Sequence, residues 1–117
     1  MDAPAQAPAT FNSKWEQYFY TAMVAAKRRF EYQKPFWGGH FARGGTVVDF
    51  VDTSPGQLRP IAIYIDGPYW HHMRNTGKAL EDKLKRARLD RMGYNVKVVT
   101  TEAETPEGCR KWIKENL

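Results

Sequence analysis

The sequence predicts an α/β protein in which a mixed four-stranded sheet is flanked by helices. Two β-branched apolar runs, TVVDFV (46–51) and PIAIYID (60–66), are separated by a short turn that contains Ser-Pro-Gly. A long helical segment (75–93) then comes before a further strand, YNVKVVT (94–100). Because a short turn joins antiparallel strands and a helical crossover joins parallel ones, the sheet should contain both kinds of pairing.

Length and composition limit the class of protein. A chain of 117 residues is long enough for one domain with its own core. The first ten residues lack the basic and apolar regions of a signal peptide, and their Ala and Pro content predicts a disordered leader before a single domain over residues 11–117. No apolar run approaches the roughly 20 residues of a membrane span. The single Cys109 excludes an internal disulfide, and we expect no structural zinc.

The first predicted helix runs from about Ser13 to Arg28. Ser13 and Glu16 have the spacing of a capping box, which satisfies backbone donors at a helix start. Apolar side chains recur at helical spacing at Trp15, Tyr18, Phe19, Ala22 and Met23. The segment FEYQ (30–33) can then begin a strand, which we expect Pro35 and the glycines beyond it to break.

The second half of the chain predicts two more helices. The segment 75–93 has Asn75 or Thr76 as its cap and Gly93 where a C-terminal glycine belongs. Its expected apolar stripe consists of Leu80, Leu84, Ala87 and Met92. The last helix has a cap, a first-turn proline and apolar residues for packing at Thr105, Pro106, Trp112 and Ile113.

Strand alternation points to a possible site for chemistry. Val47, Asp49 and Val51 should share one face of their strand, where an Asp is disfavoured and expensive to bury without a partner. If this strand pairs with 60–66, Asp49 and Asp66 converge near one end of the sheet. Two carboxylates facing one gap form a hard-oxygen site suited to Mg²⁺. His71 follows five residues after Asp66, where a loop can return it as a base or a ligand.

Each of these side chains also has an ordinary structural interpretation. Asp49 can pair with an arginine such as Arg43. Asp66 precedes Gly and Pro, which is common turn chemistry. His71 can be solvated or bonded to the backbone, and the capping box alone can account for Glu16.

Charge adds a second expectation. The net charge is +5 and the pI about 9.4, which favours a polyanionic partner such as nucleic acid. Basic residues gather in the segment 75–93, at Lys83, Lys85, Arg86, Arg88 and Arg91. Because Glu81, Asp82 and Asp90 are interspersed among them, a plain solvated helix face is the alternative interpretation.

In the order of its landmarks the chain resembles the Vsr-like branch (very short patch repair endonucleases) of the PD-(D/E)XK superfamily, which has the restriction-endonuclease-like fold. The likeness runs from about residue 13 to residue 100. The segments that carry it are Glu16 on the opening helix, FEYQ (30–33), GGTVVDF (44–50), IYIDGPYWH (63–71) and DKLKRARLDRMGYNV (82–96). The string Asp-Gly-x-aromatic-Trp-His in the fourth of these segments is the most specific of them.

This resemblance implies a restriction-endonuclease-like αβββαβ core and a Mg²⁺- or Mn²⁺-dependent DNA endonuclease or nickase. Asp49 would hold the metal with the backbone carbonyl of Ile65 and with Asp66, which completes the polar site, and Glu16 would be a further catalytic carboxylate. His71 would be the general base. Tyr69 and Trp70 would wedge into the base stack. The alternative interpretation is that both side chains are core or lid aromatics. Lys83, Lys85, Arg86 and Arg88 would bind DNA.

Two further hypotheses stay open beside the nuclease. The third strand carries Tyr64-Ile65-Asp66, where the wider superfamily has an acid, any residue and a lysine. A non-catalytic protein of the same fold, binding nucleic acid or serving in a virion or another protein assembly, is therefore the alternative, and RNA is the alternative substrate. Arginine partners on Asp49 and Asp66 would favour the non-catalytic protein. Small proteins of this kind resemble bacterial or phage products, so we expect a cytoplasmic location or a place in a virion, and no membrane partner.

Overall fold

The computed structural model describes residues 10–66 and 76–117. In this part of the chain the helices are α1 (Lys14–Ala25), α3 (Thr76–Arg91) and α4 (Pro106–Asn116). The strands are β1 (Phe30–Phe36), β2 (Thr46–Asp52), β3 (Ile61–Ile65) and β4 (Asn95–Val99), with short 3₁₀ turns η1 (Gly39–Phe41) and η2 (Thr101–Glu104). The described order of helices and strands confirms the predicted one. The predicted leader, except Thr10, lies outside the described residues.

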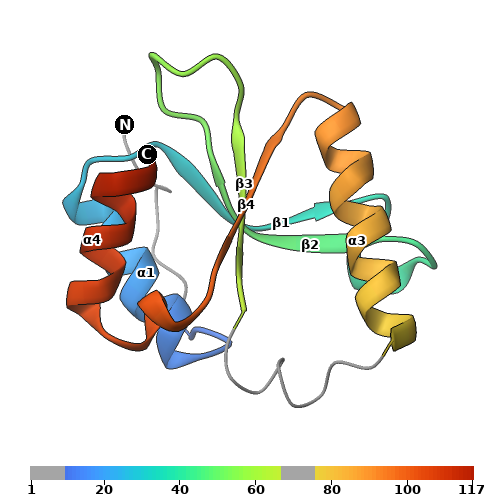
Figure 1. The fold of residues 1–117 in the computed structure, drawn as a ribbon, viewed down its shortest axis with the longest axis horizontal. Coiled ribbons are helices and arrows are strands. Elements are labelled where there is room, and N and C mark those ends of the chain that lie inside the picture. The colour runs from blue at the N-terminus through green and yellow to red at the C-terminus, as the bar shows by residue number, and fades with distance from the viewer. Residues whose placement is uncertain (1–9, 67–75) are drawn as a thin grey trace.

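The four strands form one mixed sheet in the order β1-β2-β3-β4. β1 pairs antiparallel with β2 and β2 antiparallel with β3, whereas β3 and β4 are parallel. The helices α1 and α4 lie on one side of the sheet and α3 lies on the other (Figure 1). The predicted α/β class and mixed pairing are therefore confirmed.

Two apolar clusters hold these layers together. The larger one joins α1, α4 and the sheet, and it includes Phe19, Met23, Phe50, Ile63 and Cys109, each completely buried. The smaller one joins α3 to the opposite face through Phe36, Val48, Val51, Ala62 and Leu89. Burial of this apolar surface is the main favourable term in folding, so the two clusters determine how the helices sit on the sheet.

Helix α1 begins as predicted but ends earlier. Ser13 is its N-cap, and its hydroxyl accepts a hydrogen bond from the Glu16 amide at 3.2 Å. The helix stops at Ala25 and not at Arg28, because Lys27 takes a left-handed conformation with φ +57°. Arg28 then turns back to Asp52 at the end of β2.

Strand β1 continues through Pro35 to Phe36, so the expected break at Pro35 is wrong. β1 is an edge strand, and a proline, which lacks an amide hydrogen, is tolerated there. The start of α4 follows the prediction, since Thr105 is the N-cap and Pro106 opens the helix, and its predicted packing residues Trp112 and Ile113 are buried. Gly93 has φ +101° after α3, as a C-terminal glycine should.

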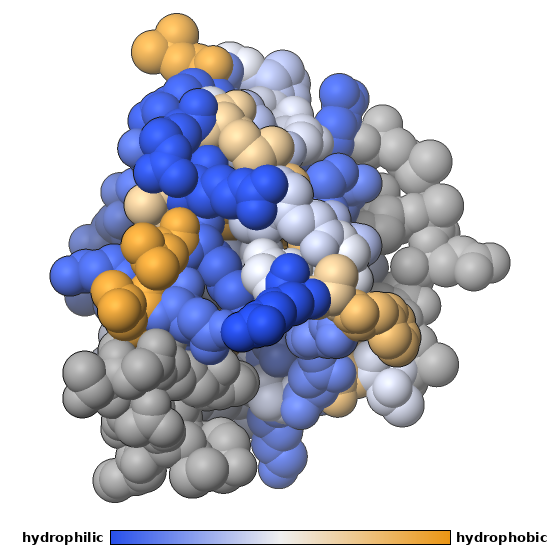
Figure 2. Space-filling view, turned by 90° about the vertical axis from the view of Figure 1, so that its right-hand side faces the viewer, coloured by the Kyte–Doolittle hydropathy of each residue, from blue (hydrophilic) through white to orange (hydrophobic). Residues whose placement is uncertain are grey.

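The predicted apolar stripe of α3 is wrong. Leu80, Leu84 and Met92 are 57%, 61% and 53% exposed, and Ala87 is exposed as well. Among the α3 residues whose burial is described, 80–91, Leu89 is the one that enters the core. The face of the molecule that carries α3 is accordingly mostly hydrophilic, with separate hydrophobic patches (Figure 2). None of the described helices is long and apolar enough to cross a membrane.

Strands β1 and β2 change face where Gln33 stands opposite Asp49. On one side of this point Tyr32 and Phe50 belong to the larger cluster, and on the other side Phe36 and Val48 belong to the smaller one. Gln33 has φ +57°, which interrupts the regular alternation of side chains. Val51 packs in the same cluster as Val48, so the strict alternation on which the shared face of Asp49 and Val51 was predicted does not hold along this part of β2.

A candidate active site where two strands diverge

Strands β2 and β3 separate at Asp49. Their backbones are paired from Asp52 opposite Ile61 to Phe50 opposite Ile63, and the pairing stops there. Beyond this point the carboxylate of Asp49, not a backbone carbonyl, accepts the amide hydrogen of Ile65, with Oδ2 and N 2.8 Å apart. The Asp49 side chain thus occupies the point of divergence, and it satisfies a backbone donor that the strands leave unpaired.

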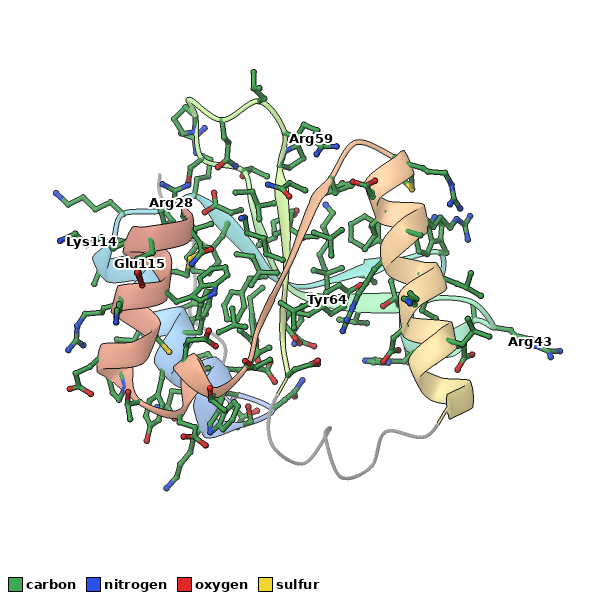
Figure 3. All side chains as sticks on the ribbon, viewed as in Figure 1. Arg28, Arg43, Arg59, Tyr64, Lys114 and Glu115 are labelled. Atoms are coloured by element: carbon green, nitrogen blue, oxygen red, sulfur yellow. The ribbon has the colours of Figure 1, made fainter. Side chains whose placement is uncertain are left out.

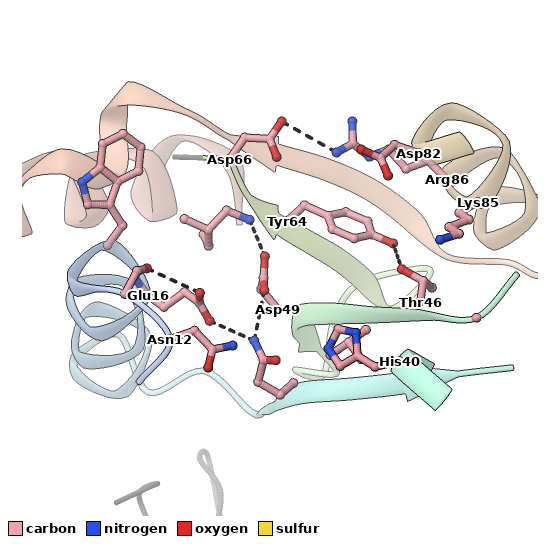
Figure 4. Close-up of a pocket in the computed structure, with 16 residues that line it drawn as sticks. Asn12, Glu16, His40, Thr46, Asp49, Tyr64, Asp66, Asp82, Lys85 and Arg86 are labelled. Atoms are coloured by element: carbon pink, nitrogen blue, oxygen red, sulfur yellow. Dashed lines mark hydrogen bonds and ion pairs between the residues drawn. The ribbon is translucent and has the colours of Figure 1, made fainter. Parts of the chain in front are cut away.

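A cleft of about 600 Å³ opens where the strands diverge (Figure 4). It is lined by the start of α1, the segment around η1, the separated parts of β2 and β3, and one face of α3. The lining residues are Asn12, Ser13, Trp15, Glu16, Gln33, His40, Gly45, Thr46, Val47, Asp49, Tyr64, Ile65, Asp66, Asp82, Lys85 and Arg86. Segments far apart in the sequence therefore contribute polar groups to one space.

Gln33 links two of the carboxylates. Its Nε2 donates to Asp49 Oδ1 at 3.0 Å and to Glu16 Oε1 at 2.8 Å, so these two oxygens lie no more than about 6 Å apart. Asp49 does not pair with Arg43, which extends from the far end of the β1–β2 connection (Figure 3). No arginine of residues 10–66 and 76–117 pairs with Asp49, so the pairing with Arg43 is wrong.

Glu16 is more than a capping residue. It is buried, and its Oε1 also accepts from the Tyr32 hydroxyl at 2.8 Å. The Ser13 hydroxyl contacts its other oxygen at 3.4 Å, which retains a local link to the helix start. The capping box alone does not account for Glu16, because its carboxylate lies in the cleft beside Asp49.

Negative charge is concentrated around Asp49. Burial, and then the nearby charge of Glu16, raise the pKa of Asp49 from 3.8 to about 7, with a smaller contribution from Asp66. The hydrogen bonds from Ile65 and Gln33 oppose this rise only in part. Burial also raises the pKa of Glu16, against hydrogen bonds from Tyr32, Ser13 and Gln33. The contacts of these carboxylates are neutral donors, so a bound cation would stabilise their ionised forms.

Asp66 has a different partner. It follows β3, and its amide donates to the Val99 carbonyl at 2.8 Å. Its carboxylate lies 3.7 Å from an Nη of Arg86, whose guanidinium stands over the Tyr64 ring at 4.9 Å. Asp66 and Asp49 line the same cleft, as predicted, but Asp66 already has an arginine beside it.

The fit to a metal ion can be judged from the donors. Among residues 10–66 and 76–117, no three His, Cys, Asp or Glu side chains are grouped as a metal site. The donors that do converge, Asp49 and Glu16, are hard oxygen ligands without a cation, which suits Mg²⁺ or Mn²⁺. Ile65 lines the cleft next to them, with its amide bonded to Asp49. The donor set therefore fits a divalent ion at Asp49.

The predicted nucleic-acid-binding residues separate into three groups. Lys85 and Arg86 line the cleft. Lys83 and Arg88 are exposed and outside its lining, and the Arg88 guanidinium stacks on Trp37 at 3.8 Å. The predicted wedge residues Tyr69 and Trp70 and the predicted base His71 lie outside the described residues.

Sequence reasoning missed several groups in the cleft. Gln33 was part of the FEYQ resemblance, but its position between Glu16 and Asp49 depends on a backbone kink at positive φ. The sequence has no glycine there that would predict such a kink. His40 and Thr46 also face the cleft, and Thr46 Oγ1 lies 3.4 Å from the hydroxyl of Tyr64, which the sequence had singled out only as the replacement of an acid. His40 follows a Gly-Gly pair without any periodic pattern, so only the glycine-rich turn could have drawn attention to it.

Comparison of the chain with protein-family models, with curated proteins and with solved structures returned no match. The likeness to Vsr-like nucleases therefore stays a prediction from the residues.

Proposed function

We propose that this protein is a divalent-metal-dependent DNA endonuclease or nickase with the restriction-endonuclease-like fold of the Vsr-like branch. The observation that carries the proposal is the environment of Asp49. Its carboxylate stands where β2 and β3 diverge, meets Glu16 through Gln33, and faces a cleft that also contains Lys85 and Arg86. A cleft that contains carboxylates able to bind a metal cation, together with basic side chains able to bind phosphate, is suited to phosphodiester hydrolysis.

The roles follow from the chemistry of each side chain. Asp49 would hold Mg²⁺ or Mn²⁺, and Glu16 and the backbone carbonyl of Ile65 would be further oxygen donors. A metal bound there supplies Lewis acidity that offsets the negative charge of the transition state. Asp66 completes the polar site and, through its ion pair, positions Arg86. His71 is the general base that the resemblance assigns.

The direct test is plasmid nicking. Purified protein should convert supercoiled DNA to the open-circular form with Mg²⁺ or Mn²⁺ and should not do so with excess EDTA. A duplex carrying a T·G mismatch and an RNA of the same sequence establish the substrate class. Absence of any cut with either metal, on every one of these substrates, would overturn the proposal.

One observation favours a second candidate, a non-catalytic nucleic-acid-binding protein. The Asp66 carboxylate is neutralised by Arg86, and Tyr64 takes the place of the acid that the superfamily has on this strand. Such a protein would bind DNA with steep salt dependence and leave it intact. The same nicking assay, run beside a binding titration at several salt concentrations, separates the two candidates.

A further inference from the structure

We infer that Arg86 is the phosphate-binding residue of the cleft and that its guanidinium takes an oxygen of a nucleic-acid phosphodiester. The inference rests on the proposed function for the identity of the ligand and on the geometry around Arg86 for the site. It assigns to one arginine of α3 a two-donor contact with phosphate that its neighbour Lys85, a single point charge, does not make.

The guanidinium is held in place but incompletely bonded. Tyr64 lies under it at 4.9 Å, and the Tyr64 hydroxyl in turn lies 3.4 Å from Thr46 Oγ1. Asp66 approaches one Nη at 3.7 Å, which is an ion pair but is longer than a hydrogen bond. The Arg86 side chain, 24% exposed, is thus fixed in orientation by a ring and a charge.

The Nε–H of Arg86 is the unusual group. It is buried and has no hydrogen-bond partner among the described residues. Proteins rarely leave a buried donor unpaired, because its desolvation is not compensated. Nε–H and an adjacent Nη–H form the planar edge of a guanidinium that matches two oxygens of one phosphate. The Arg86 side chain is 24% exposed, and a small rotation toward the cleft would bring this edge to a phosphodiester, which would supply the acceptor that Nε lacks.

The position of Arg86 fits this ligand. It lines the cleft together with Asp49 and Glu16, which Figure 4 shows on the other side of the Tyr64 ring. A phosphodiester beside the Tyr64 ring would have one oxygen toward Arg86 and another toward the carboxylates that are proposed to hold the metal. Lys85 also lines the cleft, but an ammonium group is a point charge without a two-donor edge.

Arg88 provides a matched control. It lies two residues further on α3 and also stacks on an aromatic ring, that of Trp37 at 3.8 Å. It is exposed and does not line the cleft. Both arginines have the same charge and similar stacking, so a difference between them reports the cleft and not the general basicity of the helix.

The first measurement follows the arginine Nε–H signals of the wild-type protein by NMR, in EDTA, during titration with dimethyl phosphate. The Arg86 signal should shift in a saturable way and the Arg88 signal should stay in place. No shift at Arg86, or equal shifts at both arginines, would overturn the inference. A shift with inorganic phosphate alone would assign the site to a free phosphate and would also overturn it.

The second measurement is binding of a fluorescein-labelled 16-base-pair duplex, also in EDTA. Arg86→Lys keeps the charge and loses the two-donor edge, and it should weaken binding roughly tenfold. Arg88→Lys, at a residue of the same basic helix that does not line the cleft, should weaken binding clearly less than Arg86→Lys, and equal losses in the two variants would contradict the inference. Matching amide spectra establish that both variants are folded. Because both binding measurements are made in EDTA, their results do not depend on cleavage. If the wild-type protein nicks DNA but Arg86 does not respond to phosphate, only the inference about Arg86 fails. If Arg86 responds but no DNA is cut, only the proposed nuclease function fails.

Discussion

Two aspartates three residues apart on β2 have opposite environments. Asp52 is completely buried, and its carboxylate accepts from Arg28 Nε at 2.8 Å, from the Ser54 amide at 2.8 Å and more distantly from Gln57 at 3.4 Å. Asp49 accepts from the Gln33 side chain and the Ile65 amide. The first carboxylate has a cation against it, whereas the second has two further carboxylates nearby, those of Glu16 and Asp66.

Burial alone therefore does not distinguish a carboxylate that stabilises the fold from one that is suited to binding a cation. Asp52 ties the β2–β3 connection to the end of α1, and Ser54 and Thr53 reinforce this link by bonding the Arg29 backbone. Every oxygen of Asp52 has a donor that balances or shares its charge. The charge around Asp49 has no such balance, and this is what makes Asp49 the candidate for binding a cation.

The largest expected effect is on the rate of DNA nicking, which should depend on Asp49 and not on Asp52. Asp49→Asn should lower the rate of DNA nicking by about 10³-fold or more, because it removes a charge proposed to hold the metal. Asp52→Asn should keep the wild-type rate per folded molecule. The check is single-turnover nicking at a temperature where both variants are folded. Equal losses in the two variants would show that the contrast is one of stability only.

The second prediction concerns stability, and here the substitution of Asp52 should have a larger effect than that of Asp49. Asp52→Asn should lower the free energy of unfolding by about 2–3 kcal/mol, since it leaves Arg28 without its charged partner in a buried site. The value is below that of a fully buried pair because the Arg28 side chain is 21% exposed. Asp49→Asn should be no less stable than wild type at neutral pH. Urea unfolding measures both, and a larger loss in Asp49→Asn would contradict the assignment.

The same contrast shows what sequence reasoning can reach. The α/β class, the mixed pairing and the helix caps were predictable, because they follow from local periodicity, turn residues and crossover length. The meeting of Asp49 and Asp66 in one cleft followed from pairing two strands by their pattern. These features depend on residues close in sequence or on a single strand pairing.

The details that decide the chemistry depend on tertiary contacts. The kink at Gln33 places a non-glycine residue at positive φ, which strand alternation cannot predict. The Arg86–Asp66 pair joins residues of α3 and β3 whose relative position only packing determines. The stripe predicted for α3 was wrong because Leu80, Leu84, Ala87 and Met92 were assumed to face the sheet, whereas Leu89, which was not part of that row, enters the core.

A third prediction concerns metal binding without cleavage. Mg²⁺ or Mn²⁺ at ten times its dissociation constant should stabilise wild type by about 1.4 kcal/mol, which corresponds to a rise in Tm of about 5 °C. Asp49→Asn should lose this rise and Asp52→Asn should retain it. The measurement is a thermal melt with and without metal, with an equal ionic strength of NaCl as control. A rise that survives in Asp49→Asn would place the ion elsewhere.

The smallest expected effect is a pH dependence that Asp49 adds to folding. Its pKa is raised from 3.8 to about 7, so the folded state holds a proton that the unfolded state releases between these values. The stability contributed by protonated Asp49 is therefore complete below about pH 4 and is lost as the pH rises through about 7. Relative to Asp49→Asn, wild type should lose about 1 kcal/mol or more of unfolding free energy between pH 5 and pH 8, a value well below the full shift because the cleft is open to water.

Urea titrations of wild type and Asp49→Asn at a series of pH values measure this difference. Glu115→Gln, a change at an exposed carboxyl on α4, serves as the control for general titration of the surface. If the difference between wild type and Asp49→Asn stays flat or grows with pH, the Asp49 carboxylate is balanced in the same way as that of Asp52. The cleft would then contain no uncompensated charge, and the reason for placing a cation beside Asp49 would be gone.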